Sequence, residues 1–122
     1  MPVITTLPSI GAYCPQDSAT ALKGVKGGVY SVTLASNLTL TDAYPSVLMI
    51  DPAAARDVTL DDIASHAGLF RRIVNWADAA ETITVKDATP ATIATIEQNR
   101  EAEFYCDGTA WNFICKRIIS LS

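Results

Sequence analysis

Short runs of β-branched and aromatic residues, separated by turn-forming residues, follow one another from Val29 onward. In the segment 38–41 (Leu-Thr-Leu-Thr), the leucines fall on one face of an extended chain and the threonines on the other, as a half-buried strand requires. The segment 81–87 alternates in the same way, with Ile83 and Val85 on the inward face. This pattern is typical of an all-β sandwich or barrel.

The runs predict eight or nine strands, which cover residues 29–34, 38–41, 46–51, 56–60, 69–77, 81–87, 92–96, 102–106 and 111–119. Asp107-Gly108 predicts a tight hairpin, and residues 98–101 predict a polar turn. The segment 61–68 allows one helical turn, with an aspartate as its N-cap and Gly68 as its terminator. We therefore predict an all-β fold, a jelly roll or related β-sandwich of about eight strands, over residues 29–122.

Residues 1–28 have a different pattern. They hold three of the six prolines and four of the six glycines, and they show no sustained period of a strand or a helix. We interpret them as an extended N-terminal arm, with a disordered terminus as the alternative. Five apolar side chains favour the arm, because a solvated tail usually carries fewer such anchors: Val3, Ile4, Leu7, Ile10 and Tyr13.

The charge balance excludes several classes of partner. Nine Lys and Arg stand against thirteen Asp and Glu, so the chain has no excess of cations for nucleic acid or for an anionic membrane. The N-terminal sequence lacks the features of a secretory signal, and no apolar run is long enough to span a membrane, so we expect synthesis in the cytoplasm. Charged residues make up only 18% of the chain, so we expect much of its surface to consist of uncharged threonine and alanine. Such a surface suits contact with other protein.

Candidate chemistry is sparse. His66, the one histidine, has no cysteine at a spacing that indicates a catalytic pair, and we expect it to be an exposed turn residue. Asp61 and Asp62 are interpreted as helix-cap and solvent carboxylates instead of a metal pair. The three cysteines, Cys14, Cys106 and Cys115, are expected to be free thiols, because Cys106 should lie opposite Trp111 across the hairpin. We predict no catalytic, cofactor-binding or metal-binding residues.

Two pairs of side chains leave alternatives open. Arg71 and Arg72 are neighbours in an apolar strand, so one of them points inward to a carboxylate or a subunit boundary, or else both extend to solvent from an edge strand. The carboxylate partners proposed for them are Asp57, Asp78, Glu101 and Glu103. Trp76 and Trp111 are interpreted as core or interface anchors, with a carbohydrate-stacking platform as the alternative.

Several segments together resemble small structural proteins of tailed bacteriophages, namely head decoration (cement) proteins and some virion fibre domains. The resemblance is scattered over residues 36–113, and its segments are 38–41, 48–52, 56–60, 68–70, 73–75, 79–87 and 106–111. It implies a compact β fold, commonly a homotrimer, that sits on the outer capsid lattice between capsomers. No catalytic residues are carried over, and the pairing of Trp76 with Arg71-Arg72 in one strand has no counterpart in the family.

The sequence therefore predicts a non-enzymatic virion protein without cofactors, made in the host cytoplasm and placed on the outer capsid surface. Its expected partners are the major capsid protein and its own copies in a homotrimer. The alternative is a fibre or receptor-binding domain that contacts host glycans. The side chains expected to make subunit or capsid contacts are Ile4, Leu7, Ile10, Tyr13, Arg71, Arg72, Trp76 and Trp111.

Overall fold

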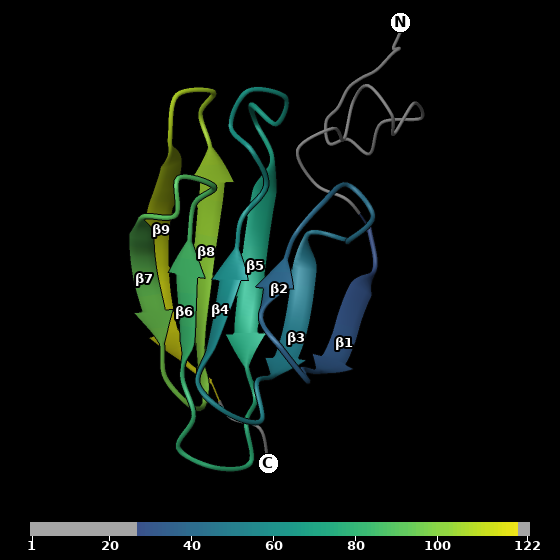
Figure 1. Ribbon diagram of the computed structural model, residues 1–122, viewed down its shortest axis with the longest axis vertical. Helices are drawn as coiled ribbons and strands as arrows, with labels where there is room; N and C mark the ends of the chain where they lie inside the picture. Colours follow the sequence, from purple (N-terminus) through teal and green to yellow (C-terminus); the bar gives the residue numbers. More distant parts are fainter. Residues whose placement is uncertain (1–26, 120–122) are drawn as a thin grey trace, which may run out of the picture.

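A computed structural model describes residues 27–119, which form nine strands in two sheets without a helix (Figure 1). The strands are β1 (Val29–Thr33), β2 (Leu38–Thr39), β3 (Val47–Asp51), β4 (Arg56–Thr59), β5 (Phe70–Asn75), β6 (Ile83–Lys86), β7 (Thr92–Ile96), β8 (Arg100–Cys106) and β9 (Trp111–Ile118). These bounds confirm the expected strand positions. Within the described range there is accordingly no helix of the length and apolarity that a bilayer span requires.

Successive strands from β1 to β6 alternate between the two sheets, whereas β6 and β7 share one sheet and β8 and β9 share the other. The five-stranded sheet has the order β1-β3-β5-β8-β9, and the four-stranded sheet has the order β2-β4-β6-β7. The pairs β1–β3, β3–β5, β2–β4 and β4–β6 are parallel, whereas β5–β8, β6–β7 and β8–β9 are antiparallel. The chain thus forms three successive coils, and each coil contributes one strand to each sheet (Figure 1). The coils are β1–β2, β3–β4 and β5–β6.

This topology bears out an all-β sandwich but does not confirm a jelly roll. A jelly roll is built from antiparallel strands, and four of the pairings here are parallel. The period-2 alternation of a strand fixes which side chains point inward, but it is the same for either direction of the neighbouring strand. A parallel pair needs a crossover connection, and here the strand in the opposite sheet provides it.

The core lies between the two sheets. Ile83 and Val85 point into it as the alternation predicts, and both are fully buried. The other hydrophobic side chains with 0% exposure come from both layers: Leu48, Ile50, Val58, Ile73, Ile96, Ala102, Phe104 and Cys106. Burial of an aliphatic side chain of this size stabilises the fold by about 1.5–3 kcal/mol, so this layer is the main source of stability.

Asn75 is a polar side chain in this core. It is fully buried at the end of β5, and its Nδ2 donates to the carbonyl oxygens of Ile96 and Glu81, each at 2.9 Å. Its Oδ1 accepts from the Ala77 amide at 3.0 Å. Because β5 and β7 belong to different sheets, the amide joins the layers at this end of the sandwich.

Three local expectations have clear outcomes. The Asp107-Gly108 hairpin is confirmed, with Gly108 at a φ of 91° and Cys106 paired with Trp111. The segment 61–68 forms turns instead of a helical turn, although Gly68 has the left-handed φ (88°) expected of a terminator. The polar turn is shorter than expected, because Arg100 and Glu101 already pair with Ile118 and Arg117 in the sheet.

Candidate functional site

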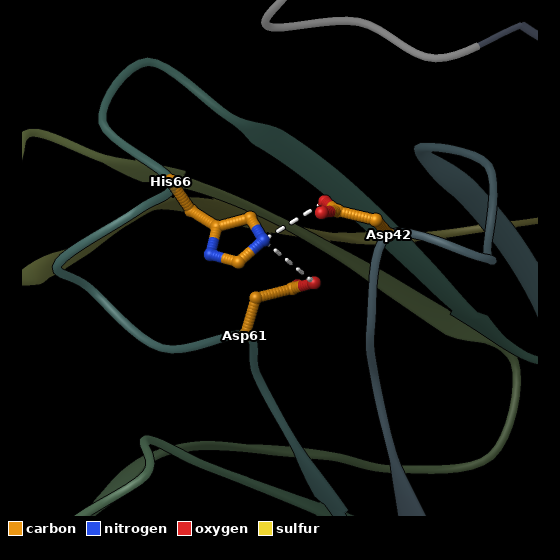
Figure 2. A group of neighbouring side chains, drawn as sticks. All are labelled: Asp42, Asp61 and His66. Atoms are coloured by element: carbon orange, nitrogen blue, oxygen red, sulfur yellow. Dashed lines mark hydrogen bonds and ion pairs between the residues drawn. The ribbon is translucent and has the colours of Figure 1, made fainter.

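A histidine and two aspartates from two loops meet at one end of the sandwich (Figure 2). Asp42 lies in the loop between β2 and β3, and Asp61 and His66 lie in the loop between β4 and β5. The Nε2 atom of His66 is 2.9 Å from Asp42 Oδ1 and 3.8 Å from Asp61 Oδ2. We refer to these three residues as the His66 cluster.

The hydrogen bonds of the ring define its orientation. Nδ1 lies 2.7 Å from the carbonyl oxygen of Asp62, which can only accept, so Nδ1 carries a proton. Nε2 therefore faces the two carboxylates either as the second N–H of an imidazolium or as a lone pair. Burial lowers the pKa of His66, but the bonds to the Asp62 carbonyl and Asp42, with the charge of Asp61, outweigh it and raise the pKa above its usual range.

Arg71 holds the acidic side of the cluster in place. Both Arg71 and Asp61 have fully buried side chains, and they form a bidentate pair with distances of 3.0 Å from Nε to Oδ1 and 2.9 Å from Nη2 to Oδ2. The remaining guanidinium donors bond the carbonyl oxygens of Thr41, Tyr44 and Pro45. One buried cation thus fixes Asp61 and the loop that carries Asp42.

The structure corrects two expectations about these residues and agrees with a third. His66 is not an exposed turn residue, since 11% of its side chain is accessible. Asp61 is not a solvent carboxylate, because Arg71 draws it into the core, and the indole Nε1 of Trp111 bonds its carbonyl oxygen at 2.8 Å. Asp62 does behave as expected: its carboxylate is exposed and accepts from the amide and hydroxyl of Ser65, which lowers its pKa.

Of the two alternatives for Arg71 and Arg72, the structure shows the one in which a single arginine points inward. Arg71 points inward, but its carboxylate partner is Asp61, which was not among the proposed partners. Arg72 points outward and bonds Glu103, with 2.6 Å from Nη2 to Oε2, and it lies 3.8 Å from Glu101. The strand that carries them, β5, is central in its sheet, so it is not the edge strand of the other alternative.

Arg72 belongs to a ladder of four charges on the outer face of the five-stranded sheet. Arg117 on β9 bonds Glu103 and lies 2.7 Å from Glu101, so both carboxylates on β8 stand between two guanidiniums. The Arg117 hydrogen bond is the largest influence on Glu103, and with Arg72 it outweighs burial and holds the pKa of Glu103 below its ordinary value of 4.5.

The lowered pKa of Glu103 predicts a loss of stability in acid. A carboxylate with a lower pKa in the folded than in the unfolded chain stabilises the fold above the unfolded pKa, and this stabilisation is lost as the pH falls through the folded pKa. We expect Glu103→Gln to reduce the dependence of the free energy of unfolding on pH in that window. Urea titrations at a series of pH values measure it, and an unchanged pH dependence in the variant would contradict the ladder.

The remaining predicted contact residues fall into three groups. Trp76 is 40% exposed and available at the surface, as is the outward Arg72. Arg71 and Trp111 lie in the core, since Arg71 is fully buried and 7% of Trp111 is exposed, so neither offers surface to a partner in the described structure. The arm residues Ile4, Leu7, Ile10 and Tyr13 lie outside the described residues, as does Cys14.

Two thiols lie within the described range, and both are free. Cys106 is buried between the sheets, and Cys115 pairs with Glu103 in the register of β8 and β9. The ring nitrogens of His66 face carboxylates and a carbonyl oxygen, not these thiols. The chemistry that the cluster offers is therefore the binding of a cation.

Comparison of the chain with protein families, curated proteins and solved structures found no match.

Proposed function

We propose that the chain is a non-enzymatic structural protein of a tailed-phage virion, a head decoration protein that binds the outer capsid surface as a homotrimer. The observation that carries the proposal is the apolar edge formed by β9. Phe113, Ile114 and Ile118 on this strand are 44%, 49% and 75% exposed. Single exposed apolar side chains are normal, but three on one edge strand indicate a contact surface for protein.

Among residues 27–119, nothing gives the edge of β9 the usual protection against association. β8 pairs with one side of this strand, and the other side is the end of the sheet. Edge strands are often protected by charged side chains, but Lys116 is bound to Glu97 at 3.0 Å, and Arg117 is bound to the carboxylates on β8. Their charges are thus neutralised within the chain, so a partner strand or an apolar surface can approach.

The place in a virion is supported by the sequence resemblance over residues 36–113, and the role in assembly is supported by this edge. Major capsid protein and other copies of the chain are the proposed partners. The low overall charge fits this role, because an interface core is depleted in charged residues.

Charges introduced on the edge should abolish assembly. We expect the double variant Ile114→Lys/Ile118→Lys to be monomeric and to lose binding to expanded capsids, whereas the parent chain forms trimers. Each isoleucine buried at an interface contributes about 1.5–3 kcal/mol, and a lysine would leave its charge unpaired there. Size-exclusion chromatography with light scattering and co-sedimentation with capsids measure the two effects.

Val29→Lys is the matched control, because Val29 is 58% exposed and lies on β1, at the opposite edge of the same sheet. This variant should remain trimeric. A parent chain that stays monomeric at micromolar concentration without binding capsids would overturn the proposed function. Dissociation caused by Val29→Lys and not by the double variant would place the interface on β1 instead.

The fibre-domain alternative depends on aromatic rings that can stack on glycans. Trp111 is in the core, so of the two tryptophans Trp76 alone keeps an exposed ring. The apolar edge of β9 contains one aromatic ring, Phe113, beside Ile114 and Ile118, and the isoleucines suit contact with protein better than stacking on a sugar. We therefore favour the decoration role.

A further inference from the structure

We propose that the His66 cluster is a binding site for a divalent transition-metal ion of the Zn²⁺ type. Nε2 of His66 and one oxygen each of Asp42 and Asp61 all lie within 4.8 Å of one another. Zn–N and Zn–O bonds of about 2.0–2.2 Å place two ligands of one tetrahedral ion roughly 3.3–3.6 Å apart. The distances of 2.9 and 3.8 Å from Nε2 to the two carboxylates bracket this separation (Figure 2).

The orientation of the histidine is that of a metal ligand. Because Nδ1 donates to the Asp62 carbonyl, the neutral ring directs the lone pair of Nε2 at the two carboxylates. Three acceptors then converge without a hydrogen atom between them, which is unfavourable unless a cation lies there. A hydrogen bond from the second ring nitrogen to a carbonyl is also how proteins fix the tautomer of histidines that bind metals.

The two carboxylates are held in place independently of any ion. Nη2 of Arg71 donates to Asp61 Oδ2 at 2.9 Å and to the carbonyl oxygen of Thr41, next to Asp42, at 3.0 Å. Asp61 is also fixed through its carbonyl oxygen by the indole of Trp111. The ligand set is therefore preorganised by a buried guanidinium that bonds one ligand directly and positions the loop of the other.

The local charge favours a divalent ion. With a neutral His66, the three carboxylates of Asp42, Asp61 and Asp62 and the one guanidinium of Arg71 leave a net charge of −2. The imidazole nitrogen favours Zn²⁺ and similar ions over Mg²⁺ or Ca²⁺, which prefer oxygen. An ion can reach the cluster from the side of Asp42, because the side chain of Asp42 is 72% exposed. Water would complete the coordination.

Zinc binding by the metal-stripped full chain tests the site. In calorimetric titrations with ZnCl₂ at neutral pH, we expect one ion per chain and a raised Tm in parallel thermal unfolding. His66→Gln and Asp42→Asn should each weaken binding at least tenfold, because each removes one of three ligands. The side chain of Asp42 is exposed, so Asp42→Asn keeps the test informative even where His66→Gln alters folding.

Asp78→Asn is the matched control, since Asp78 belongs to a second group of neighbouring carboxylates, with Asp51 and Glu81, that has no histidine. This variant should bind Zn²⁺ as tightly as the parent chain. Absence of binding to the parent, or equal binding by Asp42→Asn, would overturn the proposal. Nuclear magnetic resonance of the imidazole adds a direct test: if Zn²⁺ leaves its titration unchanged, the cation of the cluster is a proton and the metal site is wrong. The site does not depend on the proposed role in assembly.

Discussion

Arg71→Met should lower the free energy of unfolding by about 3–5 kcal/mol, because it leaves the charge of Asp61 buried without its partner. The side chains of both residues are fully buried, and the guanidinium also bonds three carbonyl oxygens of the loop between β2 and β3. Methionine keeps much of the volume but none of the donors. Chemical denaturation with two spectroscopic probes measures the loss.

Arg72→Met is the matched control one position along the same strand. Its side chain is 40% exposed and its ion pairs lie at the surface, so we expect a loss of less than about 1 kcal/mol. The double variant Arg71→Met/Asp61→Leu should recover part of the stability, because it removes both buried charges. Equal losses in Arg71→Met and Arg72→Met would show that the buried pair does not hold the loops.

Asn75→Ala should cost at least about 3 kcal/mol. The substitution leaves the carbonyl oxygens of Ile96 and Glu81 and the amide of Ala77 without their partner, and each unpaired buried group costs about 1–3 kcal/mol. It also removes the side-chain link between β5 and β7. Urea unfolding gives the change in free energy, and hydrogen exchange of the β7 amides shows whether the layers separate first at this end.

Asn112→Ala provides the comparison for Asn75. Its Nδ2 donates to Asp107 at 2.9 Å in the exposed hairpin, where water can replace the lost bond. We expect a change within about 0.5 kcal/mol, as for an ordinary surface substitution. A loss as small as this in Asn75→Ala would mean that water or a shifted backbone satisfies the buried groups.

The positions of the strands were predictable from the sequence, because alternation and turn residues are local signals. Ile83 and Val85 alternate with polar neighbours, and Asp107-Gly108 marks its own hairpin. The direction of pairing was not predictable. Whether Val47 lies beside Val29 in a parallel or an antiparallel strand depends on the path of the whole chain, and neither segment carries that information.

The candidate site was missed for a related reason. An inward arginine with a carboxylate partner is one of the two alternatives that the sequence leaves open, but the place of Asp61 before a possible helical turn favours its interpretation as a cap. In the structure, the carboxylate of Asp61 instead accepts from the buried guanidinium of Arg71, ten residues further along the chain. A useful signal was present: a buried arginine near a loop with two aspartates and the one histidine of the chain indicates a shared electrostatic cluster.

The alternation of β1 to β6 between the layers makes the molecule periodic along the width of its sheets. Each coil contacts the next through one strand in each layer, so a complete additional coil next to β1 and β2 would preserve every existing register. Insertion of a single residue within a strand would instead turn its buried side chains outward. Changes in length that keep this architecture therefore come in units of a whole coil, or are confined to the loops between the layers.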